Sequence, residues 1–121
     1  MFYVPYADLS KSARTLDFAI ASAMEELEAI NYYNQRADVA PDESLREIMI
    51  HNRNEEIEHA AMLIEWFRRN IPEFHEQLST YLFTELPITE VEEDATAGGE
   101  GGDPDGKKPG ASSLGLGSLR K

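Results

Sequence analysis

The sequence predicts an all-α fold in which two long antiparallel helices precede a short third helix. Three observations favour this fold. All 8 glycines of the 121-residue chain lie between Gly98 and Gly117, so none interrupts the first 97 residues. Apolar residues recur in that region at intervals of three and four, as on an amphipathic helix. The prolines fall where helices should begin or end, and no segment has the alternating pattern of a strand.

The first helix is expected to run from about Asp8 or Ser10 to Ala37. Either polar residue can cap the N-terminus, because its side chain accepts a hydrogen bond from a free backbone N–H group. Pro41 ends any continuation, because proline cannot donate the next helical hydrogen bond. Apolar side chains repeat along one face of this helix: Leu16, Ile20, Ala23, Met24, Leu27 and Ile30.

Two more helices are expected after the turn at Pro41. The second runs from near Asp42 to about Asn70, with acidic residues at its start and two arginines at its end, as the helix dipole favours. The third begins at Pro72, since proline suits the first turn of a helix, and is closed by Leu86-Pro87.

Composition divides the chain into three parts. Residues 1–91 form a helical folding unit, residues 92–112 a flexible low-complexity linker, and residues 113–121 a terminal peptide. The linker is too polar and glycine-rich to fold by itself. A core of roughly 90 residues is marginal alone, which favours oligomerisation. The terminal peptide holds three leucines, which suit an extended segment in an apolar groove of a partner.

The chain carries 23 acidic and 11 basic side chains, a formal net charge of −12. Such a chain repels phosphate backbones and anionic lipid, so we expect cations as ligands and neither nucleic acid nor membrane as a partner. The absence of cysteine excludes disulfides, thiolate metal sites and a thiol nucleophile. No stretch has the length of a membrane span or the pattern of a signal peptide, which predicts a cytoplasmic protein.

Two polar side chains of the second helix fall inside its apolar stripe. At about 100° per residue, Glu56 and His59 project into the stripe, whereas Glu47 lies opposite. A buried carboxylate without a partner costs several kcal/mol, so Glu56 needs a cation or a proton. A Glu and a His at i and i+3 can hold one metal ion together. Glu26 lies at the edge of the apolar stripe of the first helix and offers a third ligand.

These three residues are half of a known arrangement. Ferritin-like di-iron sites take a Glu from each of two helices and a Glu-x-x-His from each of two others. One chain supplies Glu26 and the pair Glu56 and His59, so we expect two copies to form a homodimer. The dimer completes a four-helix bundle and holds two metal ions.

Other interpretations of the acidic residues stay open. A Glu-x-x-His pair can also lie on a solvated helix surface. His51, Glu55 and Glu58 share one face, where they form either an outer site for calcium or another divalent cation, or a solvated charged edge. Tyr32 and Tyr33 are, by pattern alone, packing residues rather than redox residues.

Several ordered motifs occur within about residues 15–90. They are Met24-Glu-Glu-Leu-Glu-Ala29, Tyr33-Asn-Gln-Arg-Ala37, His51-Asn-Arg-Asn-Glu-Glu-Ile-Glu-His-Ala-Ala-Met62, Glu65-Trp-Phe-Arg-Arg69 and Tyr81-Leu-Phe-Thr84. Together these motifs resemble the encapsulated ferritin family. The resemblance implies helical chains that dimerise around a di-iron ferroxidase centre and form an annular decamer. It also implies that residues 113–121 target the protein to an encapsulin shell, inside a nanocompartment of the cytoplasm.

The resemblance assigns roles to individual residues. Glu26, Glu56 and His59 of both chains would bind iron, which agrees with the helical phase. Tyr33 would lie next to these ligands. Glu25 and Glu28 would line the route by which metal reaches the site. An outer cation site would consist of His51, Glu55 and Glu58. Tyr32 stands where relatives are expected to have tryptophan.

The sequence therefore predicts a ferroxidase that oxidises Fe²⁺ to Fe³⁺ with O₂ and delivers ferric iron for storage as mineral inside an encapsulin nanocompartment. The alternative is a non-catalytic, metal-stabilised helical cargo or interaction module that uses the same ligands. The two differ in ligand saturation, because a catalytic site must leave coordination positions open.

Overall fold

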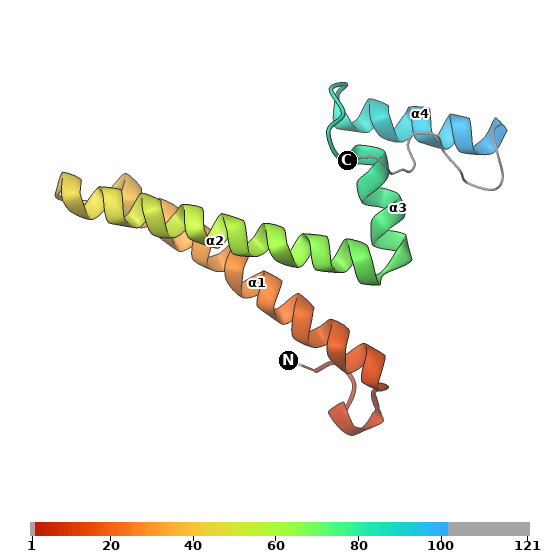
Figure 1. Cartoon of the computed structure of the whole chain (residues 1–121), viewed down its shortest axis with the longest axis horizontal. Helices are drawn as coiled ribbons and strands as arrows, with labels where there is room; N and C mark the ends of the chain where they lie inside the picture. The colour runs from red at the N-terminus through yellow and green to blue at the C-terminus, as the bar shows by residue number, and fades with distance from the viewer. Residues whose placement is uncertain (1, 102–121) are drawn as a thin grey trace. The chain divides into compact units, whose positions relative to one another are not determined.

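The computed structural model describes the backbone of residues 2–101 and the side chains of residues 2–96. Its described part is entirely helical, which confirms the predicted all-α class (Figure 1). None of the described helices is long and apolar enough to cross a membrane. The elements are a 3₁₀ helix η1 (Tyr6–Asp8) and the α-helices α1 (Lys11–Asp38), α2 (Glu43–Asn70), α3 (Pro72–Tyr81) and α4 (Ile88–Gly101).

Both long helices begin with a side-chain cap, of which the sequence predicted only the first. Ser10 precedes α1, and its Oγ accepts a hydrogen bond from the backbone N–H of Ala13 at 3.1 Å. Asp42 precedes α2, and its Oδ2 accepts one from the backbone N–H of Leu45 at 3.1 Å. Each cap satisfies a backbone donor that has no partner within the helix.

Residues 2–10 contain structure that the sequence did not predict. Between the aromatic N-terminus and α1, η1 is tied to the helix by Arg14, whose Nε and Nη2 donate to the Tyr6 carbonyl at 3.1 and 2.9 Å. The same guanidinium lies 4.1 Å from the centroid of the Tyr6 ring. Asp8, one of the two expected caps, belongs to η1 instead.

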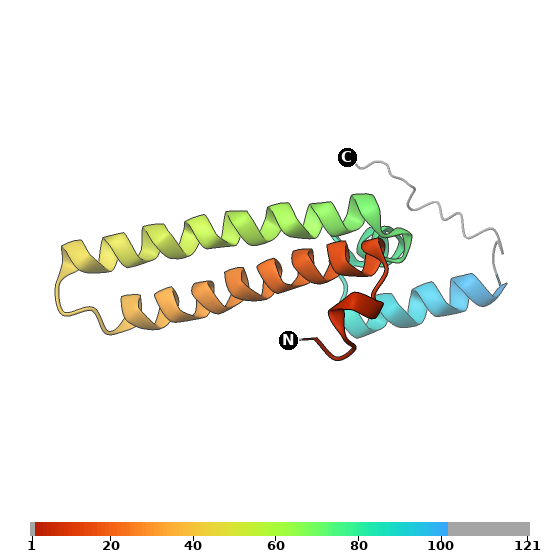
Figure 2. The same ribbon diagram turned by 90° about the horizontal axis from the view of Figure 1, so that it is seen from below.

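The chain forms two units, of which the first comprises residues 1–66. In this unit α1 and α2 run antiparallel, as predicted (Figure 2). Arg53 of α2 donates from Nη1 to Asn34 Oδ1 of α1 at 2.9 Å and bridges the two helices. The buried side chains of the unit are small, namely Ala19, Ala37 and Ala60. Small residues let helix backbones approach closely, but they bury little apolar area.

Much of the predicted apolar stripe is therefore open to solvent in a single chain. The apolar residues Leu45 and Ile48 of α2 keep 45% and 51% of their exposure. Large side chains of α1 such as Phe18 and Leu27 are exposed as well. Two helices packed as a hairpin cover only one side of each other, so the opposite apolar faces stay uncovered.

The second unit begins at Phe67 and contains the last turn of α2 with α3 and α4. Phe67 is buried and stacks on Phe74 of α3, with ring centroids 5.0 Å apart. Arg68 Nη1 lies 2.8 Å from Nδ1 of His75, a residue to which the sequence assigned no role. The helix α4 packs against α3, and its Val91 is buried.

The prediction of a structureless linker from residue 92 is wrong as far as Gly101, because α4 spans Ile88–Gly101. Pro87 precedes this helix and its carbonyl accepts from the backbone N–H groups of Glu90 and Val91. Glu90 lies in the first turn, where the helix dipole favours an acid. The end of α4 extends into the glycine-rich part of the chain, where glycine disfavours a helix. The rest of the linker and the terminal peptide, residues 102–121, lie outside the described residues.

The cap at Ser10 leads to a stability prediction. Replacing Ser10 by alanine removes the acceptor for the Ala13 N–H group, so we expect the free energy of unfolding to fall by about 1 kcal/mol. Chemical denaturation at a fixed chain concentration measures this loss. The matched control is Ser12→Ala, a change just inside the helix that should be nearly neutral. An equal loss in both variants would contradict the capping role.

Candidate metal centre

Three side chains from α1 and α2 meet in the first unit. Glu26 comes from the middle of α1, and Glu56 and His59 lie one turn apart on α2. His59 Nδ1 is 3.2 Å from Glu56 Oε1 and 3.5 Å from Glu26 Oε1. One potential ligand atom from each of the three lies within 4.8 Å of the others. The structure thus brings together the ligand trio that helical phase predicted.

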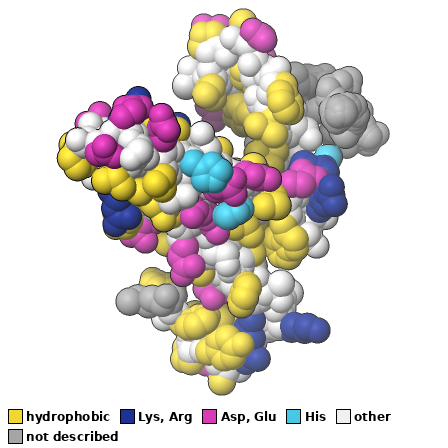
Figure 3. All heavy atoms as spheres, turned by 60° about the vertical axis from the view of Figure 1, so that its left-hand side comes forward, with side chains coloured by type: hydrophobic (Ala, Val, Ile, Leu, Met, Phe, Trp, Pro, Cys, Tyr) yellow, Lys and Arg dark blue, Asp and Glu magenta, His cyan; other side chains and the backbone are white. Residues whose placement is uncertain are grey.

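The local backbone explains this meeting. A spacing of three residues places Glu56 and His59 on the same face of α2. The antiparallel partner helix then brings Glu26 opposite them, in a register that the Asn34–Arg53 hydrogen bond also spans. Figure 3 shows acidic and histidine side chains gathered between apolar ones on this face of the molecule.

The trio is only partly covered. Glu26 and Glu56 keep 26% and 23% of their side-chain exposure, and His59 keeps 41%. Two carboxylates this close repel each other unless a proton or a cation lies between them. Because the trio is partly covered, water screens the repulsion between the two carboxylates less than it would at an open surface. The exposed side of the trio leaves room for further ligands.

Hydrogen bonding and charge shift the pKa values of all three groups. A hydrogen bond between the two carboxyl groups raises the pKa of Glu26, and burial and the charge of Glu56 raise it further. The same hydrogen bond lowers the pKa of Glu56. Glu26 therefore binds a proton more tightly than Glu56 does. The hydrogen bond to Glu56 also raises the pKa of His59, and the negative charge of Glu26 adds to the effect.

The donor set suits a hard or borderline divalent cation. Two carboxylates and one imidazole match the oxygen and nitrogen ligands that iron, manganese and zinc accept in proteins. One chain provides three ligands, which is fewer than an octahedral ion requires. Among the described residues no other group of three or more His, Asp or Glu side chains is as closely assembled.

The residues predicted to surround the centre all lie on α1. Tyr33 is half-buried, seven residues after Glu26 on the same face of α1, with the guanidinium of Arg36 5.7 Å from its ring centroid. Glu25 and Glu28, predicted to line the route for metal, are both exposed. Their placement in solvent is compatible with a first encounter with cations.

The predicted outer cation set is looser. His51 Nε2 lies 3.8 Å from Glu55 Oε2, and these side chains keep 71% and 50% of their exposure. Glu58 is exposed. This outer set does not belong to the closely assembled group of Glu26, Glu56 and His59. In the single chain His51 and Glu55 therefore form a solvated charged edge. An outer cation site at these residues remains a prediction.

Sequence reasoning missed two contacts near the centre. The Tyr32 hydroxyl donates to Glu28 Oε2 at 2.8 Å, which raises the pKa of Tyr32. Their spacing of four residues on one helix was a signal that could have revealed this pair. The Asn34–Arg53 bridge has no comparable signal, because it joins two helices whose register only the folded chain defines.

Comparison with known proteins yields consistent matches. A family profile described as EncFtn-like matches residues 1–85. The chain is 54% identical over 105 residues to an encapsulated ferritin-like protein of Rhodospirillum rubrum, covering 84% of this chain and 75% of that protein. It is 49% identical over 104 residues to a ferritin-like protein of Thermotoga maritima, covering 84% and 91%. A crystal structure of a protein from Nitrosomonas europaea shares 49% identity with a TM-score of 0.70, covering 72% and 96%.

The raised pKa values of Glu26 and His59 predict how metal binding depends on pH. A metal ion must displace any proton on these two ligands, and both of them bind protons more tightly than free side chains do. We expect the affinity for Co²⁺, used as a probe that air does not oxidise, to fall as the pH is lowered from about 7.5 to 5.5. The fall should approach about tenfold per pH unit for each displaced proton.

Titration calorimetry at several pH values measures this dependence. The control is His59→Gln, which should bind more weakly and with a shallower pH dependence because one proton fewer is released. An affinity that stays constant over this pH range would contradict the raised pKa values of Glu26 and His59.

Proposed function

This chain belongs to the EncFtn-like family, and on that premise we propose that it is a ferroxidase, which oxidises Fe²⁺ to Fe³⁺ with O₂. The family's ferritin-like character supports an iron-related function. The single observation that carries the proposal is the meeting of Glu26, Glu56 and His59, with ligand atoms within 4.8 Å.

The active centre is proposed to lie between two copies of the chain. Ferritin-like di-iron sites need two single Glu ligands and two Glu-x-x-His pairs, and one chain supplies one of each. The uncovered apolar faces support the same dimer. Met24 and Leu27 on α1, and Ile57 and Ile64 on α2, keep 64%, 57%, 48% and 43% of their exposure. A second copy with the same faces would cover them across a two-fold axis.

The ligands suit the oxidation chemically. Iron is the substrate here, and two Fe²⁺ ions held close together can each give one electron to the same O₂ molecule. Carboxylate oxygens of Glu26 and Glu56 are hard ligands and stabilise the ferric product more than the ferrous substrate. His59 binds through a neutral nitrogen, so it fixes the position of an ion without adding charge. The protons that Glu26 and His59 release on iron binding become available for oxygen reduction.

The surface chemistry supports a supply of cations. The chain has a formal net charge of −12, which raises the local concentration of Fe²⁺. In this proposal the exposed Glu25 and Glu28 pass iron toward the centre, and Tyr33 steadies the ligands from the adjoining part of α1. His51, Glu55 and Glu58 hold a further divalent cation, such as calcium, at the outer edge when the dimer is formed.

The proposal extends to assembly and location. The name of the Rhodospirillum rubrum relative describes an encapsulated protein. We propose that dimers of this chain assemble into an annular decamer, and that residues 113–121 attach it to the inside of an encapsulin shell in the cytoplasm. Storage of the ferric mineral then belongs to the shell, and this protein supplies the oxidised iron.

The competing function is a metal-stabilised helical module without catalysis. Its support is that the same trio can hold zinc or calcium as a structural ion. Open coordination positions separate the two functions, since O₂ needs access to iron whereas a structural site is saturated.

Oxidation of Fe²⁺ in air, followed by absorbance, tests the ferroxidase. We expect rapid oxidation by the native protein and a loss of at least about tenfold in Glu26→Ala, Glu56→Ala and His59→Ala, since even the neighbours of metal ligands carry effects of this size. The matched control is Glu47→Ala, an exposed acid away from the trio, which should oxidise at the native rate. Oxidation no faster than in buffer, in protein shown to be assembled, would favour the structural module.

A truncation separates catalysis from targeting. Removal of residues 113–121 should leave iron oxidation unchanged and abolish loading into a coexpressed encapsulin shell. Replacing the three leucines of the peptide by serine, at positions 114, 116 and 119, should do the same at constant length. Loss of oxidation in either variant would contradict the proposed division of labour.

A further inference from the structure

The turn that joins α3 to α4 presents an unusual aromatic side chain to solvent. Phe83 keeps 95% of its exposure, and its neighbours Leu82 and Leu86 keep 47% and 52%. Phe83 is also the one non-glycine residue of the described chain with a positive φ, 63°. A bulky residue pays for this conformation, and such strain persists where it places a side chain for a purpose. An exposed, strained phenylalanine is suited to insertion into another surface.

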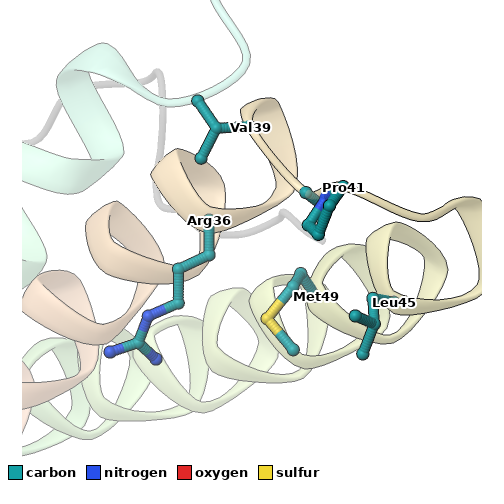
Figure 4. A pocket seen from close by; sticks show the side chains of 6 residues that line it. Arg36, Val39, Pro41, Leu45 and Met49 are labelled. Atoms are coloured by element: carbon teal, nitrogen blue, oxygen red, sulfur yellow. The ribbon is translucent and has the colours of Figure 1, made fainter.

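A preformed apolar pocket lies at the hairpin end of the first unit. It has a volume of about 250 Å³, and a cavity of about 150 Å³ already accommodates benzene. Figure 4 shows Arg36 and Val39 at the end of α1 and Leu45 and Met49 on α2, which together line the pocket. The six lining residues are Arg36, Val39, Ala40, Pro41, Leu45 and Met49.

The pocket of the same chain is too far from Phe83. From Met49 to Asn70, the helix α2 extends for about 31 Å at 1.5 Å per residue. From Asn70 back to Phe83, α3 contributes about 15 Å and three connecting residues about 10 Å. A tether of about 25 Å falls short of the distance, so the aromatic ring must find a pocket on another copy.

The partner in the proposed dimer places its pocket within reach. A two-fold axis that passes between Glu56 and His59, near the midpoint of α2, aligns the end of one α2 with the start of the other. Asn70 of one copy is then level with Leu45 of the second copy, which lies about 8–10 Å to the side. The segment from Asn70 to Phe83 is longer than this separation, so the partner's pocket, unlike that of the same chain, lies within the maximum reach of Phe83.

Charge complements shape at this contact. Arg36 lies at the pocket, and Glu85 follows Phe83 by two residues in the exposed turn. A guanidinium can also lie over an aromatic ring, as Arg36 does over Tyr33 at 5.7 Å.

We propose that Phe83 of each copy inserts into the hairpin-end pocket of its partner in the metal-centred dimer. This inference rests on the dimer of the proposed function. Two symmetric contacts clamp the two ends of the dimer, while the metal ligands hold its middle.

Cross-linking tests the contact directly, because the full-length chain has no cysteine of its own. The double variant Phe83→Cys/Ala40→Cys is treated with a short bis-maleimide and separated on a denaturing gel. We expect a covalent dimer in high yield and no larger product, since both cross-links join the same two chains. The control is Phe83→Cys/Ser12→Cys, because the partner's Ser12 lies at the far end of its α1, beyond the tether.

Sedimentation of the unmodified protein with Co²⁺ separates the possible failures. If it forms dimers but cross-links no better than the control, the contact is refuted while the dimer stands. A ladder of larger products would show that position 83 lies at the pocket of a neighbour outside the dimer. An internal cross-link would show that it lies at the pocket of its own chain. Either result overturns the proposal. Monomeric protein would refute both the contact and the dimer.

A binding measurement provides a second test. Phe83→Ala should raise the dissociation constant of the dimer by at least about tenfold, because it removes a buried ring from each of two contacts. The control is Tyr3→Ala, which removes an aromatic ring that is fully exposed at the N-terminus. Equal dissociation constants for Phe83→Ala and the native protein would overturn the contact.

Discussion

The repulsion between two carboxylates at the seam of α1 and α2 is the constraint on which the rest of this structure depends. The carboxyl groups of Glu26 and Glu56 lie close enough for a hydrogen bond, and His59 Nδ1 lies 3.5 and 3.2 Å from their oxygens. Such a cluster is costly unless a cation or a proton neutralises it. The chain accepts that cost within an otherwise apolar face, and the proposed function supplies the cation that removes it.

The same hairpin is incomplete in its packing. Its buried residues are alanines, whereas Phe18, Leu27 and Ile57 remain exposed. A second copy would cover these faces and double the ligand set in one step. The small buried core and the incomplete ligand set of the candidate metal centre therefore have a common explanation in the proposed dimer. The proposed insertion of Phe83 into the hairpin-end pocket of a partner would add a further contact to the same dimer.

Local chemistry made most of the fold predictable. Ser10 and Asp42 cap the long helices because each offers an oxygen to a free N–H group. Pro72 opens α3 because proline needs no hydrogen bond in a first turn. The helix α4 was not predicted, because the glycines at its end disfavour a helix. Its acidic start is a weak signal, and the burial of Val91 depends on packing against α3, which the sequence does not show. The contact between Arg14 and Tyr6 escaped as well, because the sequence shows no regular spacing there.

Helical phase by itself determined which side chains face the seam, so Glu26, Glu56 and His59 could be named from the sequence. Phase says nothing of how far one helix is shifted along another. Only the tertiary structure decided that Glu26 lies opposite the pair on α2, in the register that Asn34 and Arg53 bridge. It likewise decided that His51 and Glu55 face solvent rather than the centre. Side-chain direction follows from the geometry of one helix, whereas proximity between helices depends on their packing.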